Sequence, residues 1–311
     1  MERGGVIAAQ LKLEDELEWQ FQNELDKQFR KTYESGQTLY HYTSLQSLMG
    51  MMETDNLWMS KGNFLNDSSE LIYFANVLKT VIAKMQRQKE AELWKLFVDE
   101  LEAAMEHFLE QIEESGFEVY IFSMSHTQDS LALWYNYAKG EGYNLGVYAE
   151  DLLGKLTGLQ EGRRAIHGFV EYGRKEQELL LMNFLIGTFK VAKNHDIQKV
   201  KAALPEHFFT IISSFAIFFK YPAFKSEEEY RIALMDKSGE LQPAVRFRAQ
   251  NSVIIPYIAL DFNSQLPLSH ITIGPKNNID IAKRGMEHYL KSKGYDIEQL
   301  TISKSVAALR Y

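Results

Sequence analysis

The stretch Lys220-Tyr-Pro-Ala-Phe-Lys-Ser-Glu-Glu-Glu-Tyr-Arg-Ile-Ala-Leu234 marks the change from helical to strand-forming sequence. Residues 204–219 before it are strongly apolar and predict a buried helix, whereas the chain after Pro222 is rich in β-forming residues. Strand side chains alternate between two faces, so we expect Glu227, Glu229 and Arg231 on one face. Neighbouring carboxylates repel unless a cation or ligand lies between them. The stretch therefore predicts either a site for a cation or a ribose hydroxyl, or a salt-bridge ladder on an edge strand.

The rest of the chain alternates helical and strand patterns. Strands are predicted at 39–42, 57–60, 118–125, 143–148, 169–172, 229–235, 244–247, 253–260, 271–274 and near 301. Helices are predicted at 8–33, 44–55, 67–87, 90–114, 130–138, 175–193, 204–219 and 279–291. No linker rich in proline, glycine or serine divides this series. We therefore expect an α+β fold, with an N-terminal helical extension over 1–37 and a single domain over 38–311 that carries helical insertions around 67–115 and 175–219.

Composition limits the class of protein. The chain has 311 residues, of which 45% are hydrophobic and 24% charged, and this balance excludes disorder over most of its length. The absence of cysteine excludes disulfide frameworks, cysteine-bound metals and cysteine nucleophiles. We find no metal-ligand spacing, no P-loop and no Gly-x-Gly-x-x-Gly run before a helix, so we expect no metal, P-loop kinase or Rossmann dehydrogenase. No uncharged apolar run approaches the roughly 20 residues that a membrane-spanning helix needs, and residues 1–10 lack the basic-then-apolar pattern of a signal peptide. We therefore expect a cytoplasmic protein that does not bind membranes.

The charge distribution argues against a surface that attracts phosphate backbones as a whole. The net charge is -8, although a local basic patch remains compatible with it. The densest basic groups are Lys84/Arg87/Lys89 and Arg163/Arg164. They lie among acidic neighbours, which is typical of solvated helix faces.

Three more polar clusters accompany predicted strands and helix starts. His41 lies inside a strand pattern, where it is either a core histidine with a satisfied ring nitrogen or a ligand-binding group. Asn66 and Asp67, followed by Glu70, predict a capped helix start and so an architectural role. Ser123 and Ser125 share one face of a predicted strand.

Taken in order, these motifs resemble the bacterial family known as domain of unknown function 2971, over roughly residues 38–290. The motifs are Tyr-His-Tyr-Thr at 40–43, Phe-Leu-Asn-Asp-Ser-Ser-Glu at 64–70, Phe-Ser-Met-Ser at 122–125, Leu-Trp-Tyr-Asn-Tyr-Ala at 133–138, Val-Glu-Tyr at 170–172, the stretch 220–231 and Ile-Gly-Pro at 273–275. Ser68 stands where a proline usually follows Asn-Asp, and Phe224 where a tryptophan is common. The family name implies no activity.

A more distant resemblance, to ADP-ribosyltransferases, does imply one. It rests on His41, Ser123-Met-Ser125 and Glu227-Glu-Glu229 in that order. The resemblance implies a split, mixed or antiparallel sheet core and NAD as the substrate. It further implies that Glu229 faces the oxocarbenium-like ribose, that Glu227 activates the acceptor, and that His41 orients the ribose.

The same resemblance assigns the remaining polar residues. Ser123 and Ser125 support the glutamate and the nicotinamide pocket, Tyr42 or Trp134 stacks on the base, and Lys220 or Arg231 binds the pyrophosphate. The expected function is ADP-ribose transfer from NAD to a protein or nucleic acid, or hydrolysis of NAD, in bacterial defence or stress. Two alternatives stay open: a non-catalytic module that senses a nucleotide, and a structural partner protein with residues 67–114 as its interaction surface.

Overall fold

The computed structural model describes residues 12–28, 36–64, 70–88, 91–114, 119–157, 165–235, 244–250, 252–262 and 264–307. The helices are α1 (Leu13–Gln28), α2 (Leu45–Glu53), α3 (Glu70–Gln86), α4 (Glu92–Glu114), α5 (Leu131–Ala138), α6 (Ala149–Thr157), α7 (Arg174–Ala192), α8 (Ile197–Phe218) and α9 (Ile279–Ser292), with short 3-10 helices η1 (Gly62–Phe64) and η2 (Pro222–Glu227). The strands are β1 (Thr38–Thr43), β2 (Asn56–Lys61), β3 (Val119–Ser125), β4 (Tyr143–Tyr148), β5 (Ala165–Phe169), β6 (Glu229–Met235), β7 (Val245–Gln250), β8 (Val253–Asp261), β9 (Leu268–Ile273) and β10 (Thr301–Lys304). The expected α+β class is confirmed.

Strand β3 is the centre of a split sheet. Its whole length pairs with β6, and β5 continues the sheet beyond β6. Its other edge is shared, because β1 pairs at Ser125 whereas β2 pairs at Tyr120 and Ile121. One arm then runs from β1 through β4 and β9 to β10, and the other from β2 through β8 to β7. The sheet is mixed, since β10 joins β9 in parallel and the other strand pairs are antiparallel.

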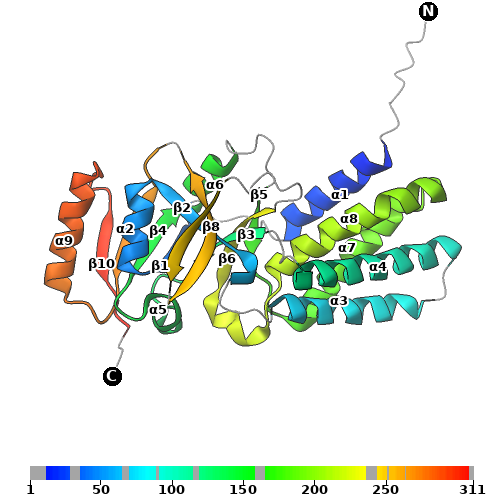
Figure 1. Cartoon of the computed structure of the whole chain (residues 1–311), viewed down its shortest axis with the longest axis horizontal. Helices are drawn as coiled ribbons and strands as arrows, with labels where there is room; N and C mark the ends of the chain where they lie inside the picture. The colour runs from blue at the N-terminus through cyan, green and yellow to red at the C-terminus, as the bar shows by residue number, and fades with distance from the viewer. Residues whose placement is uncertain are drawn as a thin grey trace, which may run out of the picture.

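Two hydrophobic cores lie on the two sides of this arrangement. One contains residues from both arms of the split, including Leu39 of β1 and Leu57 of β2, together with α2 and α9. The other joins α1, α3, α4, α7 and α8 to the opposite face of β3 and β6, where Ile121 and Ala233 lie. Figure 1 shows these five helices grouped at one end of the molecule. The N-terminal extension is thus part of a core, with Leu17 and Phe21 almost fully buried.

Some elements differ from the sequence prediction. Helix α8 begins at Ile197 because Asp196 accepts hydrogen bonds from two free amides of the first turn, and Pro205 is accommodated inside the helix. The strand expected at 169–172 is β5 at Ala165–Phe169, and only Glu171 beyond it bridges to Phe219. Helix α6 was not predicted. The residues Asn66 and Asp67 lie outside the described residues.

No helix among the described residues is both long and apolar enough to cross a membrane.

Candidate functional site

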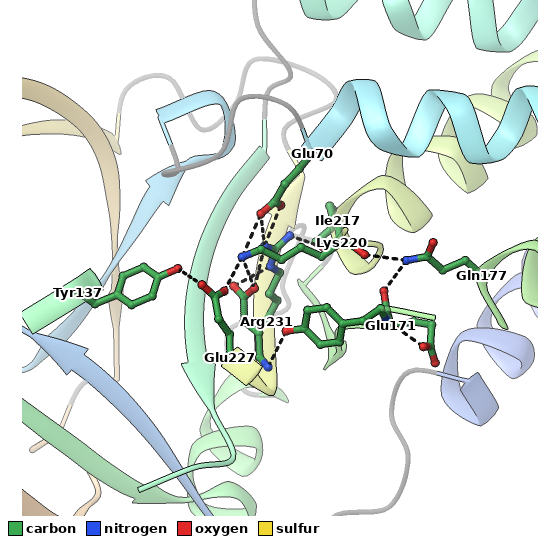
Figure 2. Close-up of polar contacts among 10 residues, drawn as sticks. Glu70, Tyr137, Glu171, Gln177, Ile217, Lys220, Glu227 and Arg231 are labelled. Atoms are coloured by element: carbon green, nitrogen blue, oxygen red, sulfur yellow. Dashed lines mark hydrogen bonds and ion pairs between the residues drawn. The ribbon is translucent and has the colours of Figure 1, made fainter. Parts of the chain in front are cut away.

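Five ionisable side chains meet where β6 begins, and we call them the charge network: Glu70, Lys220, Glu227, Glu229 and Arg231. Arg231 Nε and Nη2 bind the two oxygens of Glu229 at 2.8 and 2.9 Å, and Nη2 lies 2.9 Å from Glu70. Lys220 Nζ lies 2.6, 3.2 and 3.1 Å from Glu227, Glu229 and Glu70, respectively. Figure 2 shows that the contacts converge on one point beside β6. All five residues are at most 7% exposed, so the network is closed to solvent.

The chain positions these side chains through two local devices. Glu229 and Arg231 share one face of β6 through strand alternation, as expected. Glu227 lies at the end of η2 instead of on the strand, and Glu228 then adopts a left-handed conformation with φ of 43°. Glu227 therefore does not share the strand face, but it still lies close to the other charged residues, because the 3-10 turn brings its carboxylate to Lys220.

Neighbouring groups hold the network in place. Arg231 Nη1 donates to the carbonyl of Ile217 at 2.7 Å, and the Tyr137 hydroxyl donates to Glu227 at 2.9 Å. The Glu229 amide donates to the Tyr172 hydroxyl at 3.0 Å. The Gln177 amide donates to the carbonyl of Lys220 at 3.0 Å. The network thereby joins the helical end of the molecule to β6.

The electrostatics explain why a buried cluster of this kind is tolerated. Burial alone would raise the pKa of Glu229, but the Arg231 guanidinium and the Lys220 ammonium lower it to about 2. Burial opposes the charge on Lys220, yet Glu229 and Glu70 raise its pKa. Every carboxylate oxygen in the network has a cation or hydroxyl partner. Glu229 is therefore a charged group that is already neutralised by the protein's own cations.

His41 lies apart from this network. Tyr40 faces Ser125 across β1 and β3, and Ser125 faces Glu229 across β3 and β6, so these side chains share one face. His41 follows Tyr40 and points to the other face, where its ring stacks on Phe122 at 4.3 Å. Contrary to expectation, His41 and Glu229 do not line one cleft.

The other residues expected to bind the dinucleotide serve as supports. Trp134 is fully buried against Tyr42 and donates its ring N–H to Asp129 at 2.6 Å, so its ring faces are covered. Ser123 helps to lower the pKa of the Glu229 carboxyl, and Ser125 donates to the Glu227 carbonyl at 2.7 Å. Lys220 and Arg231 are bound to carboxylates, which leaves neither free for a pyrophosphate.

A second polar cluster, which we call the Arg248 site, lies where the arms of the sheet separate. Arg248 Nη2 donates to the Ser60 hydroxyl at 2.7 Å. Its guanidinium lies over the rings of Trp58 and Tyr257, at 5.3 and 5.8 Å from their centroids. Its Nε is buried and has no hydrogen-bond partner. The charge of Arg248 also makes a small contribution to the lowered pKa of the His41 imidazole, although the strand register places the two side chains on opposite faces of the sheet.

His41 occupies the fork between β1 and β2. Its Nδ1 lies 2.8 Å from the carbonyl oxygen of Ser123, which lies on β3 between the residues paired with β1 and those paired with β2. A carbonyl oxygen only accepts, so Nδ1 carries the hydrogen. Burial, with a smaller contribution from Arg248, lowers the pKa of His41 to about 4. The ring is thus neutral at pH 7, and its Nε2 is an acceptor.

Sequence analysis missed Arg248 because its partners come from distant strands. Trp58 and Ser60 lie on β2, about 190 residues before Arg248 on β7, and no local spacing links them. The alternation of Arg246 and Arg248 on one face of β7 was the available signal. Among the described residues, no group of three or more histidine and acidic side chains could hold a metal ion.

Comparison with known proteins supports the family but supplies no activity. Residues 133–232 match the model of a family described as protein of unknown function (DUF2971), which confirms the resemblance. The match runs from α5 into β6 and includes Tyr137, Lys220, Glu229 and Arg231. No curated protein and no solved structure matches the chain.

Proposed function

We propose that this chain binds a nucleotide at the Arg248 site and acts as a nucleotide-sensing module, not as a transferase that uses Glu229. One observation carries the proposal: the half-buried guanidinium of Arg248 lacks a carboxylate partner among the described residues. Burial lowers the pKa of Arg248, so the protein around it disfavours the charge. An unpaired cation in such a place is costly unless an anionic ligand completes it.

The chemistry of the site fits a phosphate attached to a sugar. A small rotation of Arg248 that exposes its buried Nε would present, with the neighbouring Nη, the planar pair of donors that binds a phosphate with two parallel hydrogen bonds. Nε2 of neutral His41 has no partner among the described residues and accepts a hydrogen bond from a ribose hydroxyl. The rings of Trp58 and Tyr257 lie against the guanidinium and attract its charge.

The surroundings of Glu229 argue against catalysis by this residue. A carboxylate that stabilises an oxocarbenium-like ribose must be preorganised toward the ligand. Glu229 is instead directed at Arg231 and Lys220, and it is 7% exposed. Opening this site would require breaking a buried ion-pair network.

Isothermal titration calorimetry, which measures the equilibrium binding of NAD and of ADP, tests this proposal. Arg248→Gln removes the charge and should weaken binding at least tenfold, because a charge-assisted hydrogen bond contributes about 1.5–3 kcal/mol. Arg246→Gln is the matched control, since Arg246 is an exposed arginine on the same face of the same strand. It should bind as the wild type does.

Nicotinamide release measured on the same samples separates the two functions. We expect no turnover of NAD by the wild type. Equal nucleotide binding by Arg248→Gln and wild type, or no binding by the wild type, would contradict the proposed site. Turnover that disappears in Glu229→Gln would establish the transferase instead.

A further inference from the structure

A groove between α3 and α7, which we call the α3–α7 groove, gathers basic side chains from two distant segments. Figure 1 shows the two helices in the helical end of the molecule, away from the split in the sheet. The groove has a volume of about 510 Å³, and its polar lining includes Asn76, Lys79, Thr80, Lys84, Arg87 and Arg174. Lys84 and Arg87, which the sequence suggested to lie on a solvated helix face, line this groove together with Arg174 of α7.

Among the described residues, the groove carries more positive charges than carboxylates that pair with them. Glu178 is the carboxylate in contact with it, at 2.7 Å from both Lys84 and Arg174. Lys79 and Arg87 are exposed, and neither has an ion-pair partner among the described residues. Four cations therefore face one paired carboxylate, in a chain whose net charge is -8.

Hydrogen bonds to α3 hold Arg174 in place at the groove. Arg174 donates from Nη2 to the Asn76 carbonyl at 2.9 Å and to the Thr80 hydroxyl at 2.8 Å, so its position is fixed by α3. Lys79 lies on α3, and Arg87 directly follows the last residue of that helix, so the two are eight residues and about 12 Å apart along the helix axis. This row is longer than a single phosphate group and matches an anion with repeated charges.

We infer that the α3–α7 groove binds the phosphodiester backbone of a nucleic acid without reading its sequence. Its lining is made of lysine, arginine, amide, hydroxyl and methyl groups and includes no aromatic side chain on which a base could stack. Backbone contacts of this kind position a strand but carry no base specificity. The inference is independent of the nucleotide proposed for the Arg248 site.

Fluorescence anisotropy with a labelled 20-nucleotide strand, as DNA and as RNA, tests the inference at increasing KCl concentration. The binding constant of the wild type should fall with a slope of about -2 to -3 on a double logarithmic plot, since each neutralised phosphate of a single strand contributes about 0.7. Lys79→Gln/Arg87→Gln should reduce the slope by about 1.4 and weaken binding at least tenfold at 50 mM salt.

The matched control removes two exposed lysines elsewhere. Lys95→Gln/Lys283→Gln alters α4 and α9 by the same net charge, and it should bind both strands as the wild type does. DNA and RNA should bind alike. The absence of binding by the wild type, equal losses in the two double variants, or equally tight binding of poly-glutamate would overturn the inference. Binding of NAD should be unchanged in Lys79→Gln/Arg87→Gln. A failure of the nucleic-acid test would therefore not contradict nucleotide binding at the Arg248 site.

Discussion

Replacing Glu229 by glutamine should lower the free energy of unfolding by about 3 kcal/mol at pH 7. The pKa of this carboxyl is about 2 against an ordinary value of 4.5, because Arg231 and Lys220 favour its charged form over the cost of burial. Each pKa unit corresponds to about 1.4 kcal/mol of interaction, which gives about 3 kcal/mol. Loss of one partner from a buried ion pair has a similar cost, of about 3–5 kcal/mol.

The pH dependence has a definite sign. The folded protein binds its proton at Glu229 less readily than the unfolded chain does, so this contribution is complete above pH 4.5 and is lost as the pH falls toward 2. The wild type should therefore lose stability over this window by more than Glu229→Gln does. The difference between the two proteins should shrink as the solution becomes more acidic.

Urea unfolding of both proteins at pH 7 and at pH 3.5 measures these quantities. Glu228→Gln is the control, because its side chain is 55% exposed beside the same turn, and its effect should stay within about 0.5 kcal/mol. If Glu229→Gln unfolded at the same urea concentration as Glu228→Gln, the carboxylate would not be paired as described. An undiminished difference at pH 3.5 would refute the electrostatic explanation.

Other perturbations probe the supports of the two sites. Tyr137→Phe removes the hydroxyl that donates to Glu227 and should cost about 1.5–3 kcal/mol in urea unfolding; an unchanged midpoint would contradict that bond. In NMR titration, the imidazole of His41 should titrate near pH 4, whereas a midpoint near 6.5 would show it to be solvated. Gly50→Ala should destabilise the protein and alter tryptophan fluorescence, because the new methyl group would overlap the Trp58 ring. The ordinary helix preference for alanine predicts the reverse, a gain of about 1 kcal/mol.

Sequence reasoning located most elements because their periodicity is local. The pattern at β6 also placed Glu229 and Arg231 on one face, and proximity in the chain was enough to group them with Lys220 and Glu227. Glu70 could not be added, since it reaches Arg231 from 161 residues away. Its position at a helix start predicted an architectural role, and in the structure its carboxylate pairs with Lys220 and Arg231.

The placement of His41 shows what local patterns could not supply. Its face depends on the register of Tyr40 with Ser125 and on the separation of β1 from β2 along β3. A slip of one residue would turn it to the side of Glu229. The Arg248 site needed the same long-range pairing, because β7, β8 and β2 meet only in the folded sheet.

A crystal structure of the protein with NAD or ADP bound would show directly whether the nucleotide lies at the Arg248 site or at Glu229. We expect a phosphate oxygen within about 2.9 Å of Arg248 Nε, a sugar hydroxyl at His41 Nε2, and a charge network with its contacts intact. A nucleotide seated against Glu229, with Arg231 and Lys220 turned away from that carboxylate, would contradict this expectation.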